Sequence, residues 1–292
     1  ETMLFAVALN NIPDWTQPYG RLSTRQKYRA DLARTLTQRK PQQYLVMDEF
    51  GSTLDDNSAH AISHRLQKFA RRENLSIVLA TNRTSLFPYL RPDWVLNTQA
   101  CTYALQSPRS WPRPKLKLVF TFVTGEDKQQ LWEMFKHYHY LDHRLQGNAK
   151  VFQVTCNGQI CAFQASKRQF HPADMVLAHR TVVLPQFQGL GIGTVIHEAI
   201  GAYVKRHKWR FRVRTSHVKL AAVMDKSPTW ETRELAKPHS PNTKVFKKEN
   251  RIMNGFQYQG PAMSGKKLPN IYKKEVAAKS PHLSFTKTLT VR

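Results

Sequence analysis

A short glycine-rich segment inside an apolar stretch constrains this chain more than any other feature. The stretch runs from Val182 to Ile200 and reads VVLPQFQGLGIGTVIHEAI: an apolar strand interrupted by proline, a glycine-rich turn and a helix. Gly189, Gly191 and Gly193 alternate, so we expect positive φ there, with successive backbone amides pointing at one spot. The apolar spacing after the last glycine predicts a helix whose N-terminus meets the turn. The segment therefore predicts a phosphate-binding loop.

This strand, loop and helix resemble the acyl-coenzyme A loop of the GNAT acetyltransferases. Gln188, Gly189, Gly191 and Gly193 match that family's Gln/Arg-x-x-Gly-x-Gly/Ala pattern. The resemblance implies an α/β chain with a GNAT (α+β, mixed central sheet) domain, and acetyl-coenzyme A or another acyl-coenzyme A as cofactor. It implies cofactor contacts from Val182, Val183, Leu184, Gln188, Gly189, Leu190, Gly191, Ile192, Gly193 and Thr194. The amides of the first three would bind the pantetheine arm and help stabilise an oxyanion.

Two other interpretations of the loop exist. In the first, the glycines only permit tight packing at a corner between strand and helix. In the second, the loop belongs to a dinucleotide-binding fold. A dinucleotide fingerprint requires Gly-x-Gly-x-x-Gly and an acidic residue about 20 positions further on, whereas the segment that follows here is basic.

Charge points to a polyanionic partner. The chain has 292 residues, enough for about two domains, with a net charge of +25 and a pI near 10.2. Such a charge favours nucleic acid, DNA before RNA, over a membrane surface. Three unevenly spaced cysteines predict neither a disulfide framework nor a zinc site.

Location and completeness follow from the ends and the hydropathy of the chain. Without a long apolar run or a signal peptide, we expect a soluble protein in the cytoplasm of a prokaryotic or phage-infected cell. Because the first residue is Glu1, we expect the chain to be a fragment of a longer protein.

The first hundred residues read as an α/β segment. Residues 19–36 predict an arginine-rich helix that Ser23 caps. The apolar run 44–49 ends in two carboxylates, which predicts a buried strand at the edge of a parallel sheet. A charged helix over 57–72 and a second apolar strand over 75–80 follow.

This order resembles the C-terminal half of an ABC-type ATPase. The matching residues are Ser23 and Gln26 in the signature segment, Asp48 and Glu49 in the Walker B segment and Asp55 in the D-loop. Asn82 stands where the family usually has its switch histidine. The resemblance implies ATP, Mg²⁺ held by Asp48, and a homodimer through this half. The chain contains no Gly-x-x-x-x-Gly-Lys-Ser/Thr phosphate loop, so ATP and Mg²⁺ are expected only together with a missing half. The alternative is an α/β fragment with no nucleotide role.

Composition suggests four regions. We expect a partial ATPase-like domain over 1–106, whose last strand covers 95–105, and a stiff proline-rich linker over 107–114. A GNAT-like domain over 115–260 and a flexible basic tail over 261–292 follow.

Candidate acid and base groups lie at two places in the second domain. After a strand over 116–123 and a helix that Thr124 caps, residues 137–143 combine histidines, tyrosines and an acid, and His139 and Asp142 are the first candidates. The alternative is that the tyrosines are core and the histidines solvated. Ser216 and His217 are substitutes for the tyrosine acid that GNAT enzymes usually have, because Met224 occupies its place.

A two-residue hairpin and a basic strand complete this domain. Asn157-Gly158 predicts a type I′ turn that places Val154 opposite Cys161. The strand over 209–215 alternates apolar residues with arginines, and its neighbours add lysines, so one face forms a basic ridge suited to phosphodiester contacts or simply to water. We define this basic ridge as Lys205, Arg206, Lys208, Arg210, Arg212, Arg214 and Lys219.

About 260 residues of the chain resemble prokaryotic and phage fusions of an ABC-type ATPase with a GNAT domain. Residues 139–141 and 227–230 are also similar to the phage DNA-modification protein Mom, a GNAT relative. The resemblance implies an acyl-coenzyme A-dependent N-acyltransferase acting at nucleic acid, with DNA base modification as one form. The alternatives are a nucleic-acid-binding ATPase accessory protein with an inactive GNAT-like domain, and an acetyltransferase for a small amine or a protein.

Overall fold

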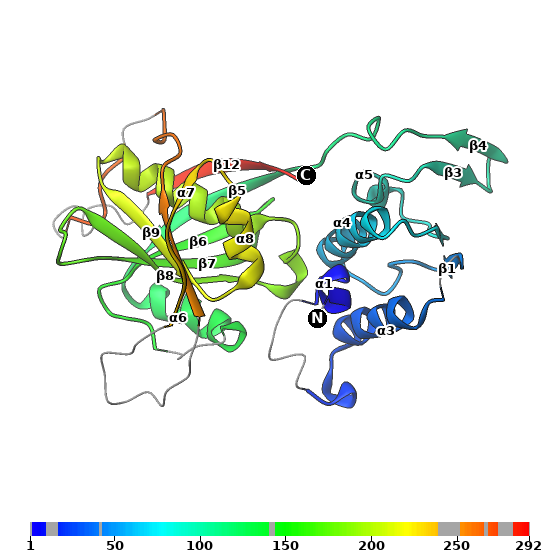
Figure 1. Cartoon of the computed structure of the whole chain (residues 1–292), viewed down its shortest axis with the longest axis horizontal. Helices are drawn as coiled ribbons and strands as arrows, with labels where there is room; N and C mark the ends of the chain where they lie inside the picture. Colours follow the sequence, from blue (N-terminus) through cyan, green and yellow to red (C-terminus); the bar gives the residue numbers. More distant parts are fainter. Residues whose placement is uncertain are drawn as a thin grey trace. The chain divides into compact units, whose positions relative to one another are not determined.

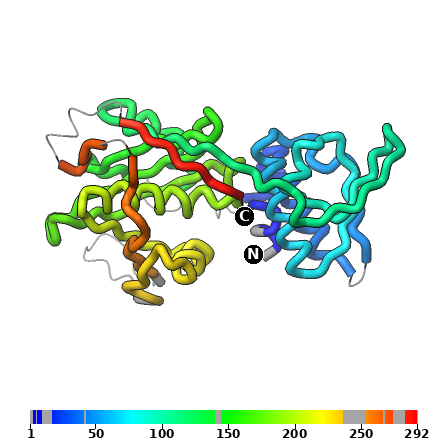
Figure 2. Tube along the Cα trace, turned by 90° about the horizontal axis from the view of Figure 1, so that it is seen from above, coloured from blue at the N-terminus to red at the C-terminus, as the bar shows by residue number. Residues whose placement is uncertain are grey.

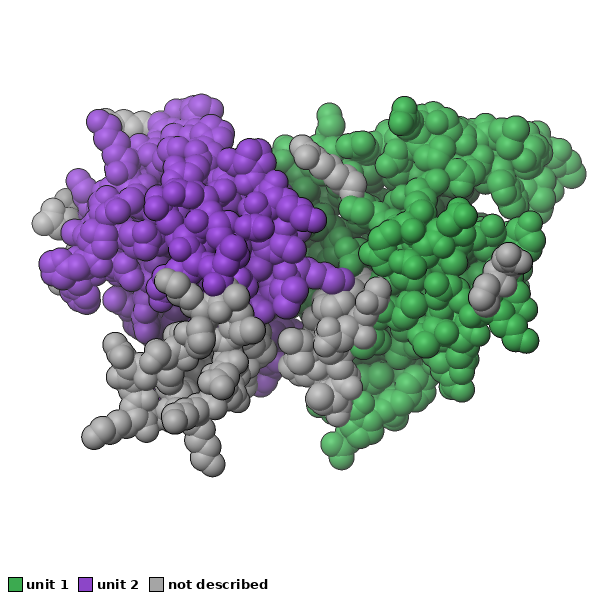
Figure 3. All heavy atoms as spheres, viewed as in Figure 1, with its two compact units in different colours: residues 1–116, 183–192, 288–292 green, residues 117–182, 193–287 purple. Residues whose placement is uncertain are grey.

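The computed structural model describes residues 2–9, 17–40, 43–139, 144–238, 252–265, 268–273 and 283–291. Its elements are drawn in Figure 1. The chain divides into two compact units, coloured in Figure 3. Unit 1 comprises residues 1–116, 183–192 and 288–292, and unit 2 comprises residues 117–182 and 193–287. The loop expected to bind the cofactor therefore groups with the first hundred residues.

Unit 1 is built around two capped helices. Its elements are α1 (Thr2–Ala6), α3 (Thr24–Gln38), β1 (Leu45–Met47), α4 (Asp56–Arg72), β2 (Ile77–Leu79), α5 (Phe87–Leu90), β3 (Trp94–Asn97) and β4 (Thr102–Leu105). The expected Ser23 cap is confirmed as part of a reciprocal capping box with Gln26. The Ser23 amide donates to Gln26 Oε1 at 2.8 Å, and the Gln26 amide donates to Ser23 Oγ at 3.4 Å. Asp55 caps α4 by accepting from the Ser58 amide at 3.1 Å.

A strand forms within the range 44–49, but the prediction that it is buried is wrong. β1 and β2 are parallel and in register from Leu45 with Ile77 to Met47 with Leu79, as the sequence suggested. However, Val46 is 70% exposed and Tyr44 is 75% exposed. Within the described residues these two strands form a sheet of their own, and a two-stranded ribbon cannot cover both of its faces.

The single strand expected over 95–105 is a hairpin of β3 and β4, paired from Trp94 with Leu105 to Asn97 with Thr102. The Asn97 side chain accepts from the Ala100 amide at 3.0 Å. Cys101 has a φ of 50°, so the chain reverses where the sequence had suggested continuity.

The strands among the remaining elements form a mixed eight-stranded sheet within the described residues, and helices accompany it. This confirms the mixed α/β class. Its elements are β5 (Lys115–Val123), α6 (Gly125–Phe135), β6 (Lys150–Cys156), β7 (Gln159–Arg168), β8 (Met175–Val183), α7 (Ile192–Arg206), β9 (Arg210–Thr215), α8 (Val218–Asp225), β10 (Trp230–Pro238), β11 (Ile252–Tyr258) and β12 (Ser284–Thr290). The strand order is β10-β11-β9-β8-β7-β6-β5-β12. β8 and β9 run parallel, whereas the β5–β6, β6–β7, β9–β11 and β10–β11 pairs are antiparallel.

The two faces of this sheet hold different helices. Phe163 of β7 contacts Trp132 and Phe135 of α6, with ring centroids 4.9 and 5.9 Å apart. Phe152 of β6 contacts Tyr203 of α7 at 5.9 Å. Because Phe152 pairs with Gln164, the neighbour of Phe163, these two phenylalanines point to opposite faces. We call these the α6 face and the α7 face.

The hairpin register differs from the expected one by one residue. Asn157 and Gly158 have φ values of 49° and 88°, as a type I′ turn requires. Val154 nevertheless pairs with Ala162, because the register shifts between Val154 and Thr155 and leaves Cys161 as the extra residue.

Thr124 also differs from the expectation. It precedes α6 at the cap position, but its side chain makes no capping hydrogen bond.

The flexible tail expected over 261–292 is wrong for the described residues of that range. β12 lies beside β5 at the edge of the sheet, as the trace in Figure 2 shows. The Phe122 amide donates to the Leu283 carbonyl at 2.8 Å, and the Val291 amide donates to the Pro114 carbonyl at 2.9 Å. Four buried apolar residues hold this strand, at the even spacing that marks one face of a strand. They are Leu283, Phe285, Leu289 and Val291.

Candidate functional site

The parallel pair β8 and β9 is joined only at its beginning. Paired residues run from Met175 with Arg210 to Leu177 with Arg212, although β8 continues to Val183 and β9 to Thr215. Within the described residues, backbone groups of β8 after Leu177 therefore have no β9 partner on this edge. Ligands of open α/β sheets bind beyond the carboxyl ends of parallel strands, and amide-containing ligands bond to free strand edges.

The loop after β8 has the shape expected of a phosphate-binding turn. A single 3₁₀ turn at Pro185–Phe187 follows the strand, and the Gln188 side chain donates to the Val183 carbonyl at 2.8 Å. Gly189 and Gly191 have φ values of 95° and 88°, as expected. Gly193 does not share this conformation, because α7 already begins at Ile192 and Gly193 lies in its first turn. The helix thus starts earlier than the glycine pattern suggested.

The two left-handed glycines have different surroundings. A Cβ atom added at Gly191 would meet no atom within 4 Å, whereas one added at Gly189 would lie 2.9 Å from Arg65 Cγ. Gly191 therefore presents open backbone. The segment 183–194 carries no charged side chain, so no acid within it offsets the partial positive charge at the N-terminus of the 15-residue helix α7.

The acid and base candidates that the structure describes have different surroundings. His139 is 8% exposed and its ring lies edge-on to Trp132 at 5.9 Å, so it belongs to the aromatic packing beside α6. Asp142 lies outside the described residues. His217 caps α8 by accepting from the Leu220 amide at 3.2 Å, and burial lowers the pKa of its imidazole. Ser216 directly precedes this cap, and Met224 is fully buried in α8.

His179 in β8 is the group that the sequence reasoning missed. It lies beyond the last β8–β9 pair, and alternation along the strand places it on the same face as Leu177, opposite Val176. Burial, followed by Arg180, Lys167 and His139, lowers its pKa from 6.5 to about 4. Its Nε2 is buried and has no hydrogen-bond partner within the described part of the chain. A histidine in an apolar strand was the available sequence signal.

Buried His197 makes the stability of the chain sensitive to acid. The side chain is 3% exposed in α7, and burial lowers its pKa from 6.5 to about 4. Between these two pH values the unfolded chain binds a proton that the folded chain does not. The free energy of unfolding therefore falls as the pH drops through this window, by roughly 3 kcal/mol from this residue.

We expect His197→Phe to flatten the dependence of the thermal unfolding midpoint on pH between 6.5 and about 4. Parallel curves for wild type and His197→Phe would contradict this account.

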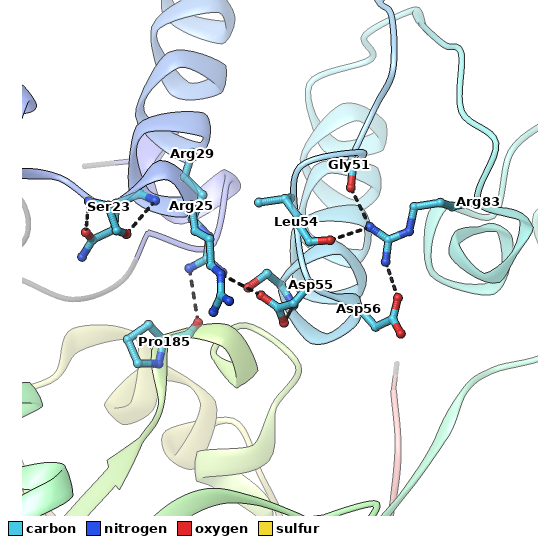
Figure 4. Close-up of polar contacts among 11 residues, drawn as sticks. Ser23, Arg25, Arg29, Gly51, Leu54, Asp55, Asp56, Arg83 and Pro185 are labelled. Carbon is cyan, nitrogen blue, oxygen red and sulfur yellow. Dashed lines mark hydrogen bonds and ion pairs between the residues drawn. The ribbon is translucent and has the colours of Figure 1, made fainter.

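The ATPase-like residues are only partly brought together. Asp55, the cap of α4, forms an ion pair with Arg25 at 3.3 Å, which joins the segment of Ser23 to the D-loop-like turn (Figure 4). Arg83 holds the same turn by donating to the Gly51 carbonyl and, at 2.9 Å, to the Leu54 carbonyl. The start of α3 and the turn before α4 therefore form one polar cluster.

A magnesium site is not supplied by these residues alone. Asp48 and Glu49 are exposed, as is Asn82, and Asp48 Oδ1 accepts from the Glu49 amide at 2.8 Å. Across the described residues, no three His, Cys, Asp or Glu side chains are grouped so that they could hold a metal ion. Asp48 would be a single protein ligand, and the printed sequence has no phosphate loop to hold the nucleotide that would supply others.

Much of the basic ridge is engaged within the protein. Arg210 forms a two-pronged contact with Asp174, at 2.7 and 3.0 Å, and Arg214 contacts Glu234 at 3.0 Å. Arg212 donates to Gln257 at 3.1 Å. Lys205 and Arg206 donate to backbone carbonyls of residues 259–265. Lys208 and Lys219 are exposed.

Comparisons with known proteins give structural similarity without sequence similarity. No protein-family model matches the chain, and no curated protein sequence matches it. The ribosomal-protein-S18-alanine N-acetyltransferase of Escherichia coli aligns with a TM-score of 0.37 and 16% identity, over 52% of this chain and 98% of its own. The diaminobutyrate acetyltransferase of Paenibacillus lautus, solved with its substrate and coenzyme A, aligns at 0.39 and 10%, over 51% and 98%.

A GNAT family acetyltransferase of Elizabethkingia anophelis with acetyl-CoA bound aligns with a TM-score of 0.31 and 14% identity, over 44% of this chain and 82% of its own. Similarity at these scores carries no conclusion about activity, which depends instead on the chain's own sheet and loop.

None of the helices in the described residues is long and apolar enough to cross a membrane.

Proposed function

We propose that this chain is an acyl-coenzyme A-dependent N-acyltransferase of the GNAT type. The observation that carries the proposal is the incompletely paired strand β8, which leads through two left-handed glycines into the N-terminus of α7. The loop amides suit a diphosphate and the open strand edge suits an amide-containing arm. Pantetheine diphosphate, the common part of every acyl-coenzyme A, combines these two chemistries.

The residues of β8 account for the remaining requirements of acyl transfer. Bound acyl-coenzyme A supplies a thioester, from which the acyl group passes to an amine as a carbon–nitrogen bond replaces a carbon–sulfur bond. The β8 amides beyond Leu177 hold the arm and donate to the carbonyl oxygen as it gains negative charge. Neutral His179 accepts the amine proton, which finally resides on the released thiol. Met224 cannot supply the proton that a tyrosine gives in other GNAT enzymes.

Calorimetry of the full chain with acetyl-coenzyme A tests this function. We expect saturable binding to one site, and acetyl transfer to an amine acceptor in a coupled thiol assay. An absence of binding by folded protein would remove the proposed function. Binding without transfer to nucleic acid, polyamine or peptide acceptors would favour the accessory protein with an inactive domain.

Nucleic acid is the acceptor class that the charge of +25 favours. Lys208 and Lys219 of the ridge are exposed, and binding of phosphates by Arg210 and Arg214 would replace their present carboxylate partners. DNA base modification is the specific form that the resemblance to Mom suggests. A small amine or a protein is the competing acceptor.

We expect Arg210, Arg212 and Arg214 changed together to Gln to lower DNA affinity and to reduce the log–log salt slope by up to roughly 0.9 for each phosphate that is no longer neutralised. Acetyl-coenzyme A binding should survive, because the loop amides carry it. A wild-type chain that ignores DNA at low salt yet acetylates a polyamine or peptide would overturn the nucleic-acid acceptor.

Coupling to an ABC-type ATPase is the other part of the proposal. It is supported by the Ser23 capping box, the Asp55–Arg25 pair and the parallel β1–β2 strands. Dimerisation through this half belongs to the same proposal. Because the printed sequence lacks a phosphate loop, this chain by itself should not hydrolyse ATP, and magnesium-dependent turnover by the pure protein would contradict the assignment.

A further inference from the structure

Two arginines from the helices of unit 1 converge on the loop between β8 and α7. Residues 183–192 belong to unit 1, together with α3 and α4. Arg29 of α3 donates to the Pro185 carbonyl at 3.2 Å and to the Ala8 carbonyl at 3.0 Å, and Figure 4 shows its side chain at Pro185. It is 3% exposed, so it fixes the start of the loop from a buried position.

Arg65 of α4 meets the other end of the same loop. A Cβ atom at Gly189 would lie 2.9 Å from Arg65 Cγ and 3.1 Å from Arg65 Cδ, so the arginine stem lies directly against the glycine backbone. The guanidinium begins one bond beyond Cδ and is therefore held close to the loop. Glycine is needed here both for its φ of 95° and for the space that the stem occupies.

The electrostatics of this end of the loop favour a strongly charged anion. The loop has no acidic residue, its amides and the N-terminus of α7 are partly positive, and Arg65 is half-buried. Burial is also the main cause that lowers the pKa of Arg65, followed by Arg72. A second positive group beside such amides is stabilised when an anion binds, and a guanidinium binds phosphate oxygens in a two-pronged manner.

We infer that Arg65 is a binding residue for the diphosphate of acyl-coenzyme A, supplied to the loop by helix α4 of the ATPase-like segment. The inference rests on the proposed function, since it assigns a residue to the same site. Arg29 is a positioning residue that holds the loop through Pro185. Both arginines and residues 183–192 belong to unit 1.

The test compares Arg65→Gln with the wild-type full chain by calorimetry, using acetyl-coenzyme A and S-acetylpantetheine, which lacks the diphosphate. Glutamine keeps Cγ and Cδ, the atoms that contact Gly189, and removes the charge. We expect the Kd for acetyl-coenzyme A to rise roughly tenfold to a hundredfold, with S-acetylpantetheine binding unchanged. Arg65→Lys should recover part of the affinity. Lys68→Gln, which removes an exposed cation one turn along α4, should have no effect.

Two outcomes would overturn the inference while leaving the proposed function intact. One is an unchanged Kd for acetyl-coenzyme A in Arg65→Gln. The other is an equal weakening for both ligands, which would indicate that the variant distorts the loop. Failure of the proposed function looks different, because the wild-type chain would then bind neither ligand.

Discussion

Replacing Gly191 by aspartate is expected to weaken acetyl-coenzyme A binding by roughly a hundredfold or more, because like charges brought together cost several kcal/mol. Gly191 has a φ of 88°, and an added Cβ would project into open space where we place the diphosphate. The carboxylate would therefore meet the ligand and not the protein. Calorimetry with the full chain measures the effect.

Gly158→Asp is the matched control for this substitution. Gly158 also has a φ of 88° and no atom within 4 Å of an added Cβ, but it lies in the turn between β6 and β7. The two variants share the backbone strain and the added charge, so only their positions differ. If both folded variants bind acetyl-coenzyme A equally well, the loop is not the diphosphate site.

Replacing His179 by phenylalanine or glutamine is expected to lower kcat roughly 10²-fold, the low end of the usual contribution of a positioned proton acceptor, because an imidazole whose pKa is lowered to about 4 is a weak base at pH 7. Phenylalanine removes the buried Nε2, and glutamine keeps a hydrogen-bond acceptor but cannot take a proton near neutral pH. Because the pKa of His179 is lowered to about 4, the imidazole is already neutral at pH 7. Its titration should therefore not limit the rate between pH 6 and 9. Steady-state kinetics and the pH profile measure both effects.

The glutamine variant distinguishes the role of His179. Recovery of the rate by His179→Gln would show that the side chain only positions the acceptor. An undiminished rate in both variants would exclude His179 from the reaction. The exposed His137→Gln is the control for removal of a histidine, and the Kd for acetyl-coenzyme A should be the same in all of these proteins.

Features governed by neighbours along the chain were predictable from the sequence. The Ser23 cap, the type I′ turn at Asn157-Gly158 and the left-handed glycines of the loop depend on backbone conformations that a few adjacent residues determine. The sequence also identified the basic strand, since its arginines alternate with buried Phe211 and Val213. Most of the proposed cofactor loop was therefore predictable before the fold was known.

Features that depend on distant segments were decided by the tertiary structure. The alternating apolar residues of 283–291 were present in the sequence, but they form a strand because β5, far earlier in the chain, offers an edge and an apolar face. The bulge at Cys161 was likewise not specified by the turn residues, because Asn157 and Gly158 adopt the expected turn and the register shifts beyond it. Three arginines of the ridge donate hydrogen bonds to Asp174, Gln257 and Glu234. These partners lie far from them in the sequence, so no local sequence pattern could predict the contacts.

The site itself shows the same division. Glycines specify the left-handed backbone of the loop, because φ is a local property. The neutrality of His179 depends on burial by other strands, and the arrival of Arg29 and Arg65 at the loop depends on contacts across more than a hundred residues of chain. Desolvation and charge act through space, so the sequence determined the loop where we propose that the cofactor binds, and the packed structure determined which charges surround that loop.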